Sequence, residues 1–72
     1  MDKEQALSKL SGLWLTYQFK HILEMHTFTD EHLTEEARGE YYGYKQALID
    51  AKLVTYDDTR LIENQRLTLK EN

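Results

Sequence analysis

Three histidines and one glutamate are the residues of this sequence that could form a metal site. His21 and Glu24 are three positions apart and would share one face of a helix, but His26 lies five positions from His21 and would point elsewhere. His32 follows only after a connecting segment, and the chain has no cysteine. Because zinc requires three or four converging ligands, we predict no metal site and no cofactor.

Carboxylates are plentiful, but they gather where helices are expected to begin. General acid–base catalysis needs two carboxyl groups in unlike environments inside a pocket, whereas carboxylates at helix starts are explained by capping and by the helix dipole. No serine or threonine has the neighbouring pair of a base and a residue that orients it, and no phosphate-binding glycine loop occurs. We therefore predict no catalytic residues and no enzymatic activity.

The acidic residues offer one kind of contact with another macromolecule. A protein with an acidic face can occupy a basic groove on a partner, including a groove that binds DNA. Solubility alone would also explain these charges. The candidate acidic contacts are Glu35, Glu36, Glu40 and Asp50.

Basic residues recur along one ridge of each of two expected helices. In an antiparallel hairpin the ridges would converge into a stripe that contacts a nucleic-acid backbone. The net charge of −4 and the usual role of lysine and arginine stems beside an apolar seam argue against this use. Nucleic-acid binding is therefore the alternative function. The stripe would contain Lys9, Lys20, Arg38, Lys45 and Lys52.

A central amphipathic helix would position most of these residues. We expect it over residues 30–53, with a cap at Thr29 or Asp30; a start at Thr34 is the alternative. Apolar residues recur at helical spacing on one face, and a smaller apolar strip runs along roughly the opposite face. The first face contains Leu33, Ala37, Tyr41, Tyr44, Leu48 and Ala51, and the second contains Tyr42, Ile49 and Leu53.

Residues 2–26 show the same two-sided pattern, with Asp2 as the cap. A short connection makes this helix an antiparallel neighbour of the central one. The Asp57–Asp58 pair can start a short helix over residues 57–65, which completes a single domain at residues 1–66 before a flexible tail at residues 67–72. One face of the first helix contains Leu7, Leu10, Trp14, Tyr17, His21 and Met25, and the other contains Leu15, Phe19, Ile22, Leu23 and His26.

Two glycines, Gly39 and Gly43, lie inside the central helix. Each costs about 1 kcal/mol relative to alanine. The helix either tolerates them or uses them to let a second backbone approach closely, with tyrosine rings beside the groove. Pairing inside a membrane is excluded because charged residues such as Arg38 and Glu40 interrupt the segment.

The size of the chain favours self-association. A chain of 72 residues buries a modest share of its surface, and the absence of cysteine excludes disulfides as a further stabiliser. We predict an all-α protein, a long antiparallel helical hairpin with a short C-terminal helix or tail, that pairs into a homodimeric four-helix bundle. Its interface would contain Phe19, Ile22, Tyr42, Ile49 and Leu53, with Gly39 and Gly43.

The N-terminus is charged from its second residue and has no pattern of a signal peptide, and no apolar run is long enough to span a membrane. We therefore expect a cytoplasmic protein that does not bind membranes. The leading hypothesis is a protein-interaction module that acts as an adaptor, regulator or inhibitor of a larger protein. Its size and lack of a catalytic pattern are similar to those of the small accessory proteins encoded by bacteria, phages and mobile elements.

Overall fold

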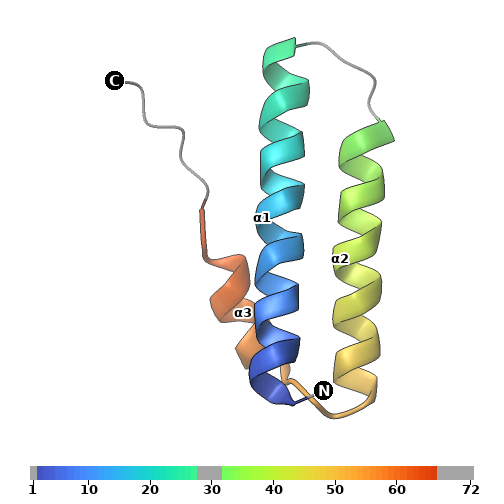
Figure 1. Cartoon of the computed structure of the whole chain (residues 1–72), viewed down its shortest axis with the longest axis vertical. Helices are drawn as coiled ribbons and strands as arrows, with labels where there is room; N and C mark the ends of the chain where they lie inside the picture. The colour runs from blue at the N-terminus through green and yellow to red at the C-terminus, as the bar shows by residue number, and fades with distance from the viewer. Residues whose placement is uncertain (1, 28–31, 67–72) are drawn as a thin grey trace.

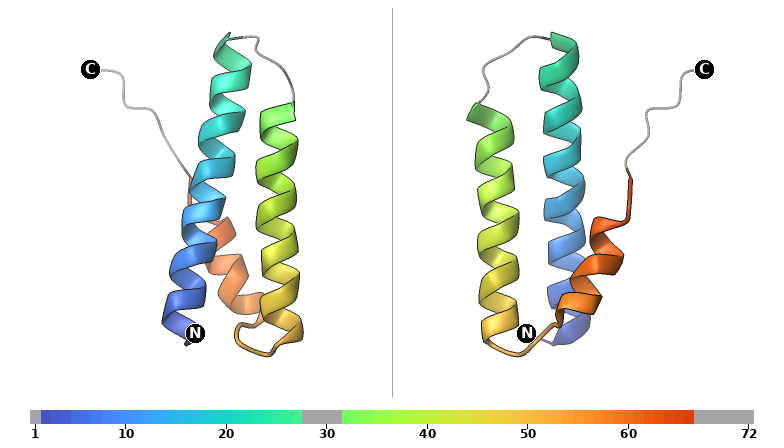
Figure 2. Two further views of the ribbon diagram at one scale, coloured as in Figure 1. Left: turned by 45° about the vertical axis from the view of Figure 1, so that its right-hand side comes forward. Right: turned by 180° about the vertical axis from the view of Figure 1, so that it is seen from behind.

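The computed structural model describes residues 2–27 and 32–66, and for residues 26, 27, 32 and 33 it describes the backbone alone. Within this part the chain forms α1 (Lys3–Thr27), α2 (His32–Asp50) and α3 (Tyr56–Glu63), and no strand. Helices α1 and α2 run antiparallel, and α3 packs against the N-terminal half of α1 on one face of this hairpin (Figure 1 and Figure 2). The predicted all-α hairpin with a short third helix is confirmed.

The core lies where the three helices meet. Ala6, Leu10 and Trp14 repeat every four residues on α1 and are buried. Four-residue spacing keeps side chains on one face of a helix, which is why this row faces the other two helices. The remaining buried residues are Ala37, Tyr41 and Leu48 of α2, Val54 of the connecting turn, and Thr59 and Ile62 of α3.

The C-terminal end of α1 differs from the prediction. Met25 is 66% exposed and His21 is also exposed, although the periodicity placed both on the buried face. Helix α1 has 25 residues and α2 has 19, and α1 extends beyond α2 at the end that carries the linker (Figure 1). Since α3 reaches only the N-terminal half of α1, the last turns of α1 have fewer neighbours to cover them.

Helix α2 ends three residues earlier than predicted. The backbone N–H of Lys52 donates to the carbonyl of Ile49, and the N–H of Leu53 donates to the carbonyl of Leu48, both at 3.0 Å. Lys52 has a φ of 60°, so this is a Schellman ending with a lysine where glycine is usual. The predicted start at Thr29 or Asp30 lies outside the described residues.

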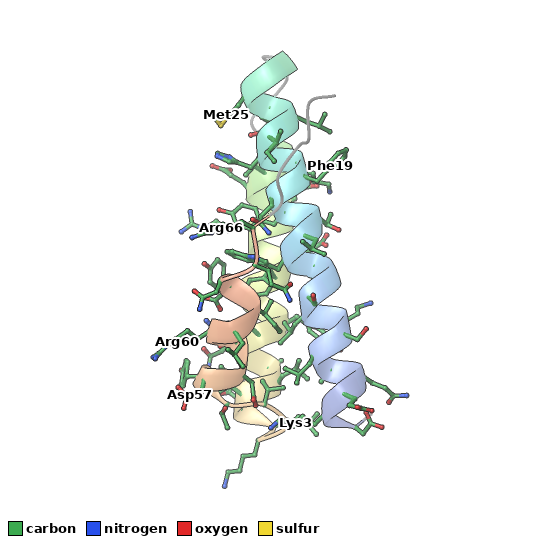
Figure 3. The ribbon with its side chains drawn as sticks, turned by 90° about the vertical axis from the view of Figure 1, so that its left-hand side faces the viewer. Lys3, Phe19, Met25, Asp57, Arg60 and Arg66 are labelled. Atoms are coloured by element: carbon green, nitrogen blue, oxygen red, sulfur yellow. The ribbon has the colours of Figure 1, made fainter. Side chains whose placement is uncertain are left out.

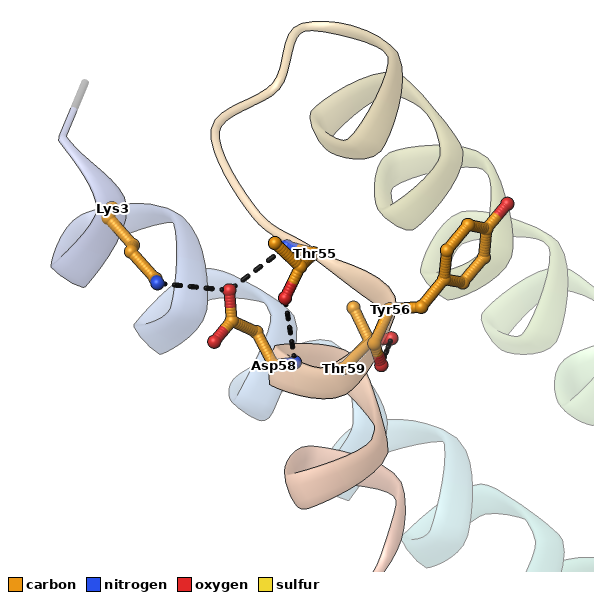
Figure 4. Close-up of polar contacts among 5 residues, drawn as sticks. All are labelled: Lys3, Thr55, Tyr56, Asp58 and Thr59. Atoms are coloured by element: carbon orange, nitrogen blue, oxygen red, sulfur yellow. Dashed lines mark hydrogen bonds and ion pairs between the residues drawn. The ribbon is translucent and has the colours of Figure 1, made fainter.

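Helix α3 begins with a capping box that includes Thr55, whereas the sequence indicated the Asp57–Asp58 pair as the cap. The N–H of Asp58 donates to Thr55 Oγ1 at 3.2 Å, and the N–H of Thr55 donates to Asp58 Oδ2 at 2.9 Å (Figure 4). The cap is therefore Thr55, and not the Asp57–Asp58 pair. Lys3 Nζ lies 3.1 Å from Asp58 Oδ2. The bond from the Thr55 N–H, followed by the contact with Lys3, lowers the pKa of Asp58.

Helix α1 begins as predicted. Asp2 Oδ1 accepts from the N–H of Gln5 at 2.8 Å, and Gln5 Oε1 accepts from the N–H of Asp2 at 3.2 Å. This reciprocal pair satisfies two backbone donors at the start of the helix. Lys3, one residue after this cap, then reaches across to α3.

Candidate protein-interaction surfaces

The outer side of α1 carries a row of large apolar side chains. Leu15, Phe19 and Leu23 are spaced four apart and are 38%, 47% and 40% exposed. Phe19 projects from α1 on the side away from α3 (Figure 3). We call these three residues the α1 ridge. Ile22, another predicted interface residue, lies beside the ridge and is half-buried.

Tyr42 is an exposed ring of α2 flanked by two cations. The guanidinium of Arg38 lies 5.8 Å from the ring centroid and the ammonium of Lys45 lies 5.5 Å from it, both within the range of cation–π attraction. The ring also packs edge-on against Tyr41, with centroids 5.1 Å apart. Lys45 Nζ lies 5.8 Å from the exposed ring of Tyr56 as well, so aromatic and cationic groups alternate on this surface.

The other two apolar residues predicted for the interface are half-buried. Ile49 and Leu53 pack against the hydrophobic core of their own chain. The turn after α2 brings Leu53 back toward Leu48, and the backbone N–H of Leu53 donates a hydrogen bond to the Leu48 carbonyl. Most of their apolar surface is therefore covered inside one chain.

A polar cluster joins α2 to α3. The hydroxyl of Tyr41 donates to Glu63 Oε2, and Lys45 Nζ lies by the same oxygen, each at 2.8 Å. Burial raises the pKa of Tyr41 well above its ordinary value, and the carboxylate of Glu63 adds to this effect. The role of Glu63 could not be predicted from the sequence, because its partners lie 18 and 22 positions away and no local pattern connects them.

A small pocket lies along α1, beyond the C-terminal end of α3. It has a volume of about 250 Å³ and is lined by residues of α1 and by Arg66. His21, which the helical spacing placed on a buried face, is an exposed part of this lining. The lining residues are Trp14, Tyr17, Gln18, His21, Ile22 and Arg66.

A larger and more open groove runs between α1 and α2. We call it the hairpin groove; its volume is about 520 Å³. A Cβ atom added at Gly39 or Gly43 would meet no atom within 4 Å, so the described chain does not pack closely against either glycine. The lining residues are Lys9 and Leu13 of α1 with Gly39, Glu40, Gly43 and Tyr44 of α2.

The predicted basic residues do not share one stripe. Arg38 and Lys45 flank Tyr42, and Lys45 is paired with Glu63 of α3. Lys9 instead lines the hairpin groove. Lys20 is half-buried on α1, and Lys52 lies beyond the end of α2.

The four predicted acidic contacts are all exposed. Glu35 and Glu36 lie near the start of α2, and Glu40 lines the hairpin groove. Asp50, at the other end of α2, accepts a hydrogen bond from the Gln46 amide at 2.9 Å. The four residues therefore extend along the helix and do not form one cluster.

Comparisons with family models, with curated proteins and with solved structures find no match to the chain. Among the described residues, no group of three or more histidine, aspartate or glutamate side chains could hold a metal ion. None of the helices in the described ranges is long and apolar enough to cross a membrane. The function is therefore inferred from the surfaces.

Proposed function

We propose that this protein is a non-enzymatic protein-interaction module, an adaptor, regulator or inhibitor, whose α1 ridge binds a larger protein. The supporting observation is the exposure of Leu15, Phe19 and Leu23 in one row of a helix. Single exposed apolar residues are common on proteins, but a contiguous apolar row is typical of a binding surface. Side chains at this spacing are the anchors of a helix that lies in an apolar groove of its partner.

The polar residues near the ridge favour an apolar groove over a charged one. Glu24 Oε1, beside Leu23, accepts a hydrogen bond from the backbone N–H of Thr34 at 3.0 Å, so this carboxylate already contacts α2. Lys20, beside Phe19, is half-buried. Affinity would then come mainly from burial of the three apolar side chains and would respond little to salt.

Capture from the source cell with three forms of the chain tests this proposal. Phe19→Asp places a charge in the middle of the ridge, and Leu61→Asp makes the same change at a residue of α3 that is 71% exposed. We expect a protein that the wild type and Leu61→Asp retain and Phe19→Asp loses, with circular dichroism showing that all three forms are folded. A partner retained equally by all three would refute the role of the ridge.

We also propose that two copies pair as a homodimeric four-helix bundle. The chain is short and has no disulfide, and the hairpin groove leaves one face of the α1–α2 pair open. Sedimentation equilibrium over a wide range of concentration tests this pairing. A monomeric mass throughout would refute it without affecting the test of the α1 ridge.

Nucleic-acid binding is the second candidate, and the rings around Lys45 favour it. Tyr42 and Tyr56 are 40% and 60% exposed with Lys45 Nζ near both, and exposed rings among cations can stack the bases of single strands. The net charge of −4 and the pairing of Lys45 with Glu63 oppose this function. Binding to a single-stranded oligonucleotide that weakens steeply with salt and is lost in Tyr42→Ala would support it.

A further inference from the structure

The hairpin groove opens on the face of the hairpin opposite α3. Ser11 on α1 and Lys45 on α2 both contact the α3 side, through Gln65 and Glu63. Lys9 and Gly43 each lie two positions before these residues, and two positions turn an α-helix by roughly 200°. Helix α3 covers one face of the hairpin, and the groove lies on the other.

Folding of a single chain gives no reason for the two glycines on this face. Alanine favours the helix over glycine, and a Cβ at Gly39 or Gly43 would enter open space. Glycine lowers the wall of the groove, where a residue with a side chain would raise it. The groove is therefore shaped to admit another backbone more closely than alanine would allow.

The charges of the groove are complementary to each other. Lys9 lies on the α1 wall and Glu40 on the α2 wall, and both are exposed. Within residues 2–27 and 32–66, neither of them makes an ion pair. A surface with one charge of each sign can pair with itself when a second copy is turned about a two-fold axis, because each contact then occurs twice.

We propose that a second copy of this chain occupies the hairpin groove, with α1 of each copy against α2 of the other and Lys9 of each copy against Glu40 of the other. Leu13 and Tyr44, both half-buried, supply the apolar walls, and Gly39 and Gly43 allow the helices to approach. The four-helix bundle would consist of two α1–α2 pairs, with each α3 on the outside. This inference rests on the pairing proposed above and names the faces that meet.

A charge-swap cycle measured by sedimentation equilibrium tests the contact. Lys9→Glu or Glu40→Lys alone turns two attractive pairs per dimer into repulsive ones, so each should raise the dissociation constant about tenfold or more. The combined variant restores both pairs and should return the constant to within about threefold of the wild-type value. The control is Arg60→Glu combined with Asp57→Lys, which swaps the charges of an exposed ion pair on α3. This variant should leave the dissociation constant of the dimer unchanged.

A glycine substitution tests the same interface through two measurements, the stability of the monomer and the affinity of the dimer, which should change in opposite directions. Gly43→Ala should raise the melting temperature of dilute, monomeric chain because alanine favours the helix. The same substitution should weaken the dimer. A variant that has lost its fold would fail the first measurement, so misfolding does not imitate the expected result.

Each outcome decides between the proposals. The hairpin groove would be refuted as the interface if the single charge swaps left the dissociation constant unchanged, or if the combined variant did not restore it. Self-association itself would still hold in either case. A chain that stays monomeric at all concentrations would overturn both. Weakening by each single swap, rescue by the pair and a weaker Gly43→Ala dimer support the groove.

Discussion

The indole N–H of Trp14 donates a hydrogen bond to the backbone carbonyl of Gln65, 3.0 Å away and 51 positions later in the sequence. Ser11 Oγ contacts the side chain of the same glutamine at 3.1 Å. The indole also packs against the ring of Tyr41, with centroids 5.0 Å apart. Trp14 therefore connects α1 both to α2 and to the segment that follows α3.

Replacing Trp14 by phenylalanine should lower the free energy of unfolding by about 2–3 kcal/mol. The change removes the hydrogen bond to Gln65 and part of a side chain that is 7% exposed. Urea denaturation followed by circular dichroism measures the loss. Tyr17→Phe keeps the ring that packs beside Trp14 and should change stability by less than about 0.5 kcal/mol. Equal losses in the two variants would contradict the special role of the indole.

Two substitutions of Glu63 should separate its contacts. Glu63→Gln keeps an acceptor for the Tyr41 hydroxyl but removes the charge opposite Lys45, and we expect it to cost about 1 kcal/mol. Glu63→Ala leaves the buried hydroxyl without its acceptor and should cost about 2–3 kcal/mol. Denaturant unfolding of both variants is the measurement. Similar losses of unfolding free energy in the two variants would mean that the ion pair with Lys45 contributes more than the hydrogen bond from the Tyr41 hydroxyl.

Alkaline pH should weaken the fold through Tyr41. Because burial raises the pKa of Tyr41 in the folded chain, the unfolded chain loses this proton first, near pH 10.0. The stability from the protonated hydroxyl is complete below that pH and falls as pH rises further, by at most about 1.4 kcal/mol per pH unit. Denaturation of Tyr41→Phe at the same pH values should show a flatter decline. Parallel curves would assign the alkaline loss to other groups.

Lys52→Gly should stabilise the chain by about 1 kcal/mol. Lys52 has a φ of 60°, a conformation that costs a residue with a Cβ atom more than it costs glycine. Ala51→Gly is the matched control: Ala51 is not among the described residues with positive φ, so glycine there should destabilise. Thermal denaturation of the two variants should give shifts of opposite sign. A drop for Lys52→Gly would show that its side chain matters more than its backbone.

The helices and much of the core could be predicted because apolar spacing depends on local geometry. Leu10, Trp14, Ala37, Tyr41 and Leu48 are buried as their periodicity indicates. The same spacing also placed Met25 on a buried face, and this was wrong because periodicity does not show where a neighbouring helix stops. Burial at the ends of helices depends on their relative lengths and offset.

The contacts that hold α3 were only partly predictable from local patterns. Thr55 and Asp58 have the spacing of a capping box, but the adjacent Asp57 offered a competing cap. The partners of Glu63 and Gln65 lie on helices distant in sequence, and only packing brings them together. One candidate surface could be predicted and the other could not. The exposure of Phe19 follows from the second apolar strip on α1, which is visible in the sequence. The hairpin groove depends on how α1 and α2 pack against each other, which the sequence does not show.

The hydrogen bond between Trp14 and Gln65 affects the order in which the core can form during synthesis on the ribosome. Helices α1 and α2 can associate once residues 3–50 have emerged, but the α3 side of Trp14 stays uncovered at that stage. Ile62 joins the hydrophobic core, and the Gln65 carbonyl accepts the bond from the indole, only after α3 has left the exit tunnel. During synthesis the hairpin therefore emerges with part of its core uncovered, and α3 can cover that part only afterwards.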